Sequence, residues 1–207
     1  MEPILFAILG GLCVIALQWL VRNRLSFGAQ RPEDYENTGT DFDIRQHLNG
    51  PLACDGVIYG PTGRVSSRFT AEFDAEWDGD ECVMRERFLY DSGNTQLRAW
   101  HLSLKTGGQI DARADDVVGT GQGSQKGSAV HLRYSIKLPE EGGGHVLDVV
   151  DWMFFGPGGT IVNRSQFRKF GIKVAELVAT VRPDPARLAK EQSVAETSPN
   201  KDGQDAA

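Results

Sequence analysis

The sequence predicts an all-β domain, an antiparallel up-and-down barrel of eight or nine strands, preceded by a single N-terminal transmembrane helix. Three observations indicate this fold. An apolar run covers residues 4–21, apolar and polar residues alternate strictly from Arg64 to Trp77, and glycine-rich turn signals recur along the rest of the chain. A period of two is typical of a strand with one buried face. Short strands between regularly spaced turns are typical of barrels and sandwiches.

Length and composition fit one folded domain with appendages. The chain has 207 residues, of which 24% are charged and 40% hydrophobic, as in ordinary globular proteins. The formal net charge of −6 lacks the basic excess of nucleic-acid-binding domains, so we expect no nucleic-acid partner. The 24 glycines follow no collagen-like period, and three cysteines are too few for a disulfide scaffold.

Residues 1–24 are expected to form the anchor. Ile4 to Val21 contains one polar residue, Gln18, and a helix of this length spans about 27 Å, the thickness of a bilayer core. Trp19 and the arginines that follow it are suited to the membrane interface. A cleaved signal peptide is the alternative, but the chain begins Met1-Glu2-Pro3 and lacks a positive leading region.

The remaining boundaries follow from composition. Residues 25–40 are polar without periodicity, which predicts a flexible tether, and residues 41–182 form the barrel domain. Pro183-Asp184-Pro185 ends strand pairing. Residues 183–207 are rich in Ala, Ser, Asp, Lys and Gln, which favours a disordered tail over a short helix near residues 186–192.

Nine runs between turn signals are expected to be strands. A flat sheet of nine strands leaves two exposed edges, so a closed lipocalin-like barrel is favoured and a sandwich is the alternative. The glycine-rich residues 119–123 do not lead into a helix as a phosphate-binding loop does, and are expected to form a mobile loop at the barrel mouth. The expected strands are Leu52–Tyr59, Arg64–Trp77, Cys82–Tyr90, Gln96–Lys105, Gln109–Val117, Ala129–Leu138, His145–Phe155, Thr160–Arg168 and Ile172–Arg182.

A charged pair is expected inside the barrel. Glu86 shares a strand face with Cys82 and Met84, and Arg98 shares a face with Trp100 on the next strand. One hairpin joins the two strands, so Glu86 and Arg98 can meet. The pair is either a structural ion pair or an anchor for the carboxylate or phosphate of a ligand.

The segment His145–Phe155 is apolar on both faces. It is therefore buried on both sides, or it presents Trp152 to a protein partner. Asp151 in this segment can be satisfied by Asn163 or Arg164 across the next hairpin, as a structural network or a ligand contact. The candidate ligand-binding residues are Glu86, Arg98, Trp100, Asp116, Tyr134, Trp152, Asn163 and Arg164.

No catalytic or metal-binding motif is present. The four histidines are scattered singly, without metal-ligand spacing, so neither a metal nor a cofactor is expected, and His101 and His131 are expected to be solvated. The Gly-x-Ser-x-Gly motif of serine hydrolases is absent. Cys54 and Cys82 are a disulfide candidate in an oxidising compartment and buried thiols otherwise.

Six segments of the chain together resemble the bacterial domain-of-unknown-function family 3833, over about residues 41–182. The resemblance implies a lipocalin-like fold and a bacterial, envelope-associated protein; members are often lipoproteins, sometimes encoded near genes that modify membrane fatty acids. No activity comes with the family. The segments are GPLACDGVIYGPTGRVSSRFTAEFDAEWDGD (50–80), RFLYDSG (87–93), RADDVVG (113–119), LRYSIKLP (132–139), VDWMFF (150–155) and IVNRSQFRKFGIKVAEL (161–177).

This chain departs from the lipoprotein pattern, because Leu12 precedes Cys13 where a small residue is needed. We therefore expect a single-pass protein of the bacterial inner membrane, anchored through residues 4–21. Arg22 and Arg24 favour a cytoplasmic domain, whereas the family habit favours the opposite side. We expect a membrane-anchored protein that binds an apolar or amphipathic molecule such as a fatty acyl chain. The alternatives are lipid modification by an interior carboxylate and a structural adaptor for an unknown protein.

Overall fold

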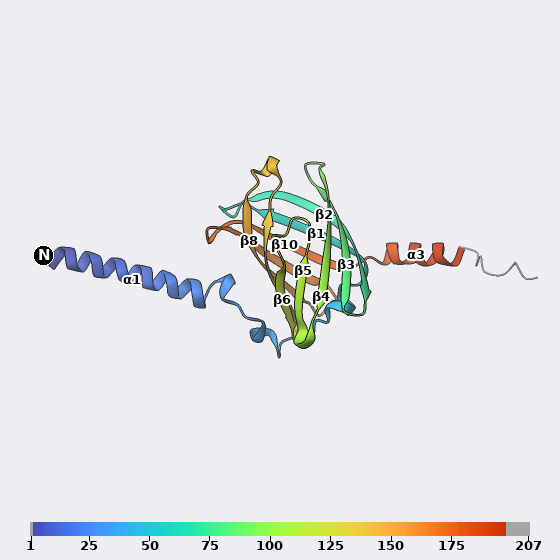
Figure 1. Ribbon diagram of the computed structural model, residues 1–207, viewed down its shortest axis with the longest axis horizontal. Coiled ribbons are helices and arrows are strands. Elements are labelled where there is room, and N and C mark those ends of the chain that lie inside the picture. Colours follow the sequence, from blue (N-terminus) through green and yellow to red (C-terminus); the bar gives the residue numbers. More distant parts are fainter. Residues whose placement is uncertain (1, 198–207) are drawn as a thin grey trace, which may run out of the picture.

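Ten antiparallel strands follow one another around a closed barrel (Figure 1). This computed structural model describes residues 2–197. Each strand pairs with the next in sequence, and β1 pairs with β10 over residues 52–59 to close the sheet. The strands are β1 (Gly50–Tyr59), β2 (Val65–Asp78), β3 (Glu81–Tyr90), β4 (Thr95–Leu104), β5 (Gln109–Arg113), β6 (Gly121–Lys126), β7 (Ala129–Lys137), β8 (Val146–Phe155), β9 (Ile161–Lys169) and β10 (Ile172–Pro183).

The predicted up-and-down barrel is confirmed, with ten strands in place of eight or nine. The additional strand is β6, which contains part of the glycine run that we expected to be a mobile loop. β6 pairs with β5 and β7, and a Cβ atom at Gly123 would lie 1.9 Å from the carbonyl oxygen of His131. The absence of a side chain at Gly123 therefore lets β6 and β7 approach closely, a role that a loop prediction misses.

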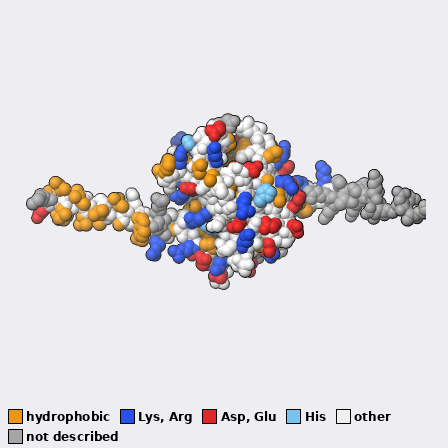
Figure 2. All heavy atoms as spheres, viewed as in Figure 1, with side chains coloured by type: hydrophobic (Ala, Val, Ile, Leu, Met, Phe, Trp, Pro, Cys, Tyr) orange, Lys and Arg blue, Asp and Glu red, His pale blue; other side chains and the backbone are white. Residues whose placement is uncertain are grey.

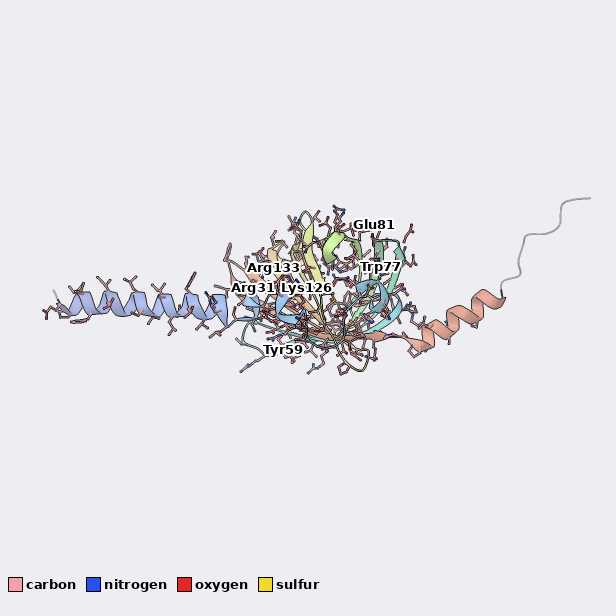
Figure 3. All side chains as sticks on the ribbon, turned by 90° about the horizontal axis from the view of Figure 1, so that it is seen from below. Arg31, Tyr59, Trp77, Glu81, Lys126 and Arg133 are labelled. Atoms are coloured by element: carbon pink, nitrogen blue, oxygen red, sulfur yellow. The ribbon has the colours of Figure 1, made fainter. Side chains whose placement is uncertain are left out.

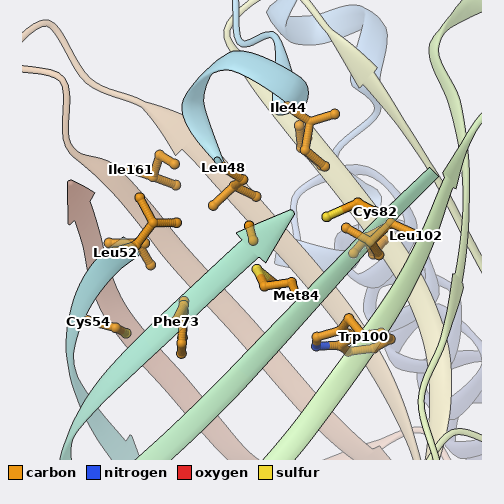
Figure 4. Packing of buried hydrophobic residues seen from close by; sticks show 14 of the residues in the cluster. Ile44, Leu48, Leu52, Cys54, Phe73, Cys82, Met84, Trp100, Leu102 and Ile161 are labelled. Atoms are coloured by element: carbon orange, nitrogen blue, oxygen red, sulfur yellow. The ribbon is translucent and has the colours of Figure 1, made fainter. Parts of the chain in front are cut away.

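The two ends of the barrel differ. At one end, here called the closed end, the segment before β1 folds into the barrel and includes the short helix α2 (Ile44–His47). Ile44 is fully buried, and the indole Nε1 of Trp77 donates a hydrogen bond of 2.8 Å to the carbonyl oxygen of Leu48. Figure 4 shows Ile44 and Leu48 above the core side chains Leu52 and Leu102. The opposite end of the barrel, which includes the turn between β9 and β10, is called the mouth.

Residues 27–36, called the strap, lie against the outer wall of the barrel. They contain two 3-10 turns, η1 (Phe27–Ala29) and η2 (Pro32–Tyr35). The ring of Tyr35 lies 5.3 Å from that of Trp152 and 5.1 Å from that of Phe154. The tether that we expected to be flexible is thus packed onto β7 and β8, and it buries Trp152 completely.

His131 lies beneath the strap and is not solvated as we expected. Its side chain is on the outer face of β7, with the ring 4.3 Å from that of Trp152. Only 8% of the residue is exposed, and this burial lowers the pKa of His131 to about 4. His101, by contrast, is exposed as predicted.

Helices extend from opposite sides of the barrel (Figure 1). The apolar α1 (Glu2–Arg24) contains the segment Glu2–Val21, which is long and apolar enough to cross a membrane and packs against no part of the barrel. Figure 2 shows hydrophobic side chains along it, whereas charges of both signs cover the barrel face in view. α3 (Pro185–Thr197) occupies part of the expected disordered tail, and residues 198–207 lie outside the described residues.

Replacing Tyr35 with alanine tests the strap. We expect Tyr35→Ala to lower the free energy of unfolding by about 1–3 kcal/mol, because packing against Trp152 and Phe154 is lost. Acrylamide quenching of tryptophan fluorescence should rise in the folded variant. Tyr59→Ala, at the mouth end of β1, is the matched control and should leave the quenching unchanged; equal quenching in all three proteins would contradict a docked strap.

Candidate functional site within the barrel

Polar side chains from five strands of the wall converge inside the mouth half of the barrel. Glu86 on β3 and Arg98 on β4 are direct cross-strand partners, as the sequence pattern predicts. Tyr134 on β7, Asp151 on β8 and Asn163 on β9 face the same interior. Interior polar groups are costly unless they are paired or hydrogen-bonded, so the partners of each one indicate what the site can do.

Asp151 is the best-satisfied member of the group. Its Oδ1 accepts hydrogen bonds from the Ser165 hydroxyl at 2.8 Å and from the Asn163 amide, and its Oδ2 accepts one from the Tyr134 hydroxyl at 3.3 Å. Burial nevertheless raises the pKa of Asp151 above its ordinary value. Burial also raises the pKa of the Tyr134 hydroxyl, which keeps it a hydrogen-bond donor.

Arg98 is held by one carboxylate and one aromatic ring. Its Nε donates a hydrogen bond of 3.0 Å to Asp116, and its guanidinium carbon lies 4.1 Å from the centre of the Trp100 ring. The Trp100 ring meets Tyr134 edge to face at 5.1 Å. The Arg98 Nη2 atom is buried and has no hydrogen-bond partner among the described residues. Asp116 and Trp100 thus hold the guanidinium group in place, while its Nη2 donor stays unused.

Glu86 is an acidic residue that is almost fully buried inside the barrel. The residue is 7% exposed, and its Oε2 has no hydrogen-bond partner among the described residues. Burial raises the pKa of Glu86 to about 8, even though Arg98 opposes the shift, and the negative charges of Asp151 and Asp116 add to it. At neutral pH Glu86 is therefore mostly protonated and can donate a hydrogen bond.

A cavity of about 120 Å³ opens onto these groups. Its lining extends from Ile44 and Leu48 at the closed end to Phe69 and Phe88 nearer the mouth, so the cavity is long for its volume. Most of the lining side chains are apolar, and the polar ones are Glu86, Arg98, Tyr134, Asp151, Asn163 and Ser165. The interior thus combines an apolar channel with a cluster of polar groups, called the interior polar cluster below.

Asp116 reaches the cluster from a connecting segment. β5 pairs with β4 only over residues 101–104, so the mouth half of β4 has no β5 neighbour. Residues 114–120 bridge this part of the wall: the Val118 amide donates a hydrogen bond of 2.8 Å to the Ser135 carbonyl, and Val117 forms a bridge with Ile136. The Arg98–Asp116 ion pair therefore ties this bridging segment to β4.

The structure brings together six of the eight residues suggested by the sequence and separates two. Trp152 lies on the outer face under the strap. Arg164 also points outward, where it pairs with Glu176 at 2.5 Å and lies 4.7 Å from the Phe27 ring. It therefore does not satisfy Asp151, a role that Asn163 and Ser165 perform. Five of the six, Glu86, Arg98, Trp100, Tyr134 and Asn163, line the cavity, and Asp116 joins them from the bridging segment through its ion pair with Arg98.

Two further residues belong to the cluster. Asp151 interrupts the apolar run Val149–Phe155, and a lone acid in such a run signals a buried polar contact. Ser165 carries no comparable signal, because serine is common on exposed strand faces. The cysteines are not bonded to each other: Cys54 and Cys82 are free and buried, and burial raises the pKa of their thiols to about 12 and about 11.

No three His, Cys, Asp or Glu side chains among residues 2–197 converge in a way that could hold a metal ion. The interior polar cluster contains two acids of raised pKa and one arginine, which suits an organic anion or a neutral polar group better than a cation.

The barrel and its sequence identify the family. A family model described as protein of unknown function (DUF3833) matches residues 23–183, which include the strap and every strand. The chain belongs to this family. Among curated proteins, none matches the chain.

Solved structures place this DUF3833 protein among lipocalin-like barrels. The S-type phycobiliprotein lyase CPES from Guillardia theta is 7% identical, with 75% of this chain and 98% of the lyase covered at a TM-score of 0.51. Rv2717c from M. tuberculosis is 15% identical, with 67% and 93% covered at a TM-score of 0.49. At these identities the likeness concerns the fold alone.

The pKa of Glu86 makes a prediction about stability. The folded state holds this proton up to about pH 8, whereas an unfolded glutamate releases it near pH 4.3. Folding therefore binds a proton between these values, and stability falls as the pH rises through this window, by up to about 1.4 kcal/mol per unit.

Chemical denaturation at pH 5, 6.5 and 8.5 measures the effect. We expect Glu86→Gln to flatten the decline, while Glu72→Gln, which removes an exposed carboxylate on the outer face of β2, retains the wild-type slope. Equal slopes for the wild type and Glu86→Gln would show that Glu86 is ionised inside the barrel.

Proposed function

We propose that this DUF3833 protein is a membrane-anchored binding protein whose barrel holds the apolar part of an amphipathic molecule, such as a fatty acyl chain. The observation that carries the proposal is the apolar cavity that meets a buried polar cluster with an unused donor and an unused carboxyl oxygen. Ligand sites of this kind combine a mostly apolar lining with a few placed polar groups.

The size of the cavity limits the ligand. Pockets for drug-sized molecules usually measure roughly 300–1,000 Å³, and this one measures about 120 Å³. A slim chain fits such a volume better than a fused ring system. The remainder of the molecule extends toward the mouth, past Phe69 and Phe88.

The head group meets Arg98. The Nη2 atom of Arg98 supplies a charged donor, and protonated Glu86 supplies a second donor beside it. Charge-assisted hydrogen bonds of arginine to carboxylate or phosphate are among the strongest that side chains form. An acidic head group therefore satisfies both buried atoms at once.

The anchor is proposed on the basis of α1. Its segment Glu2–Val21 has a mean hydropathy of 2.5, and none of it is buried against the protein. Leaving such a surface in water is costly, at about 25 cal/mol per Å², whereas a bilayer removes that cost. Twenty residues of helix span about 30 Å, enough for the hydrocarbon core.

An enzyme acting on a lipid is the second candidate function, and the raised pKa of Glu86 favours it. A carboxyl group with a pKa of about 8 beside a cavity can act as a general acid near neutral pH. Loss of product formation in Glu86→Gln, with ligand still bound, would support this candidate. A ligand that the wild-type protein returns chemically unchanged would oppose it.

An adaptor role for Trp152 has less support than binding. Its outer face is covered by Tyr35 of the same chain, so no second protein is required to bury it.

Native mass spectrometry of the full chain, released from detergent micelles and followed by lipid extraction, tests the binding function. We expect a co-purified amphipathic species with an acidic head group. The full chain is required, because a fragment starting at residue 41 lacks the strap and exposes Trp152.

Arg98→Met should lower the affinity for this species about tenfold or more, since a hydrogen bond to a charged group contributes about 1.5–3 kcal/mol. Arg87→Met, on the outer face of β3, is the matched control and should bind normally. An empty wild-type barrel, or equal binding by both variants, would contradict the proposal.

A further inference from the structure

We propose that the turn between β9 and β10 is a membrane-contacting tip, which docks the mouth of the barrel onto the anionic surface of the bilayer that holds α1. The inference rests on the membrane anchoring proposed above. It adds a second contact, an orientation of the barrel and a route for the ligand.

The tip presents apolar side chains to solvent. Phe170 is 90% exposed, more than any other large apolar side chain in the described part of the chain, and Ile172 is 69% exposed. The two residues flank Gly171 at the end of one hairpin. A bulky aromatic at a protruding turn buries nothing within the barrel, so its apolar surface is available to an external partner.

The backbone at the tip is strained. Phe170 has a φ of +53°, and it is the one non-glycine residue with a positive φ among residues 2–197. Glycine or asparagine suits this conformation, whereas a phenylalanine there is an outlier. Gly171 also has a positive φ, of +77°, as a two-residue hairpin turn requires, and the exposed Phe170 ring gains no apolar packing inside the barrel. Such positions cluster at ligand and switch sites.

Positive charge surrounds the tip. The ammonium group of Lys169 lies 5.6 Å from the centre of the Phe170 ring. Arg168 donates a hydrogen bond of 3.1 Å to the carbonyl oxygen of Gly171, which shapes the turn. Lys173 follows on β10, where its ammonium group pairs with Glu176 at 2.6 Å. An exposed aromatic among basic side chains matches a bilayer surface, where apolar groups enter between lipids and cations meet anionic head groups.

The path of the strap places the tip on the side of the anchor. The Phe27 ring contacts the Arg164 guanidinium in the middle of the wall. Further along the chain, the Tyr35 carbonyl accepts a hydrogen bond from Ser128 at the turn between β6 and β7. The Phe42 amide then donates a hydrogen bond to the Gly127 carbonyl at the closed end. The chain thus runs from α1 toward the closed end, so α1 leaves on the mouth side.

The figures agree with this path. In Figure 1 the turn between β9 and β10 lies on the side of α1, and α3 leaves from the other side. In Figure 3 the labelled Arg31 and Arg133 lie toward α1, whereas Trp77 and Glu81 lie toward α3. With the tip in the head-group layer, the mouth faces the membrane, and an acyl chain passes into the cavity without crossing water.

Spin labelling of the full chain in phospholipid vesicles tests the tip. A nitroxide is attached to Phe170→Cys in a Cys13→Ser background; Cys54 and Cys82 are buried. Thr106→Cys, in an exposed turn at the closed end, is the matched control. The measurement compares the accessibility of each label to oxygen with its accessibility to a water-soluble nickel chelate.

We expect the oxygen-to-nickel ratio at position 170 to exceed that at position 106 several-fold in anionic vesicles, and the excess to shrink in zwitterionic vesicles. Equal ratios at both positions would overturn the inference. Dipolar broadening between labels at position 170 of two chains would assign the tip to a second copy and would also overturn it.

A label on the native Cys13 separates this outcome from failure of the anchor. If that label is in lipid while position 170 is in water, the tip is refuted and the anchor stands. A Cys13 label in water refutes the anchor and the tip together. Phe170→Asn, which suits the left-handed backbone, should keep the fold and weaken the protection of residues 168–173 from hydrogen exchange in vesicles.

Discussion

Pairing of the first strand with the last is the constraint on which the rest of the structure depends. β1 and β10 meet over residues 52–59, and this contact turns a ten-stranded meander into a wall with no free edge. Closure also separates an inside from an outside. Inside, Glu86 and Asp151 lose their water, which is why the pKa of each rises. In an open sheet the same residues would be hydrated and unremarkable.

The segment before the barrel covers surfaces that closure of the sheet leaves exposed. Residues 42–48 fill one end of the barrel, and the strap covers the apolar outer face of β8. Both follow α1 in the chain, and the direction of the chain places the closed end of the barrel away from α1. The cavity, the interior polar cluster and the exposed tip then follow one another from the closed end to the mouth.

Sequence patterns predict the strands of the barrel wall better than the segments that cover it. The alternation in β2 and the Glu86–Arg98 pairing follow from period two and from one short hairpin, and both are local. β6 was missed because its glycines serve a contact with β7 that no local pattern shows. The side on which Trp152 lies cannot be predicted locally, because both faces of β8 are apolar and the residue that covers its outer face, Tyr35, is distant in sequence. Arg164 faces outward because its neighbours Asn163 and Ser165 face the interior.

Photo-crosslinking with a diazirine-bearing fatty acid, in vesicles containing the full chain, tests the central claim most directly. Peptide mapping should locate the adducts on side chains that line the cavity, such as Met84, Phe88 and Trp100, and an excess of unlabelled fatty acid should remove them. Adducts confined to α1 and to the turn between β9 and β10 would show that lipid touches the protein only from outside, and would contradict a ligand-binding barrel.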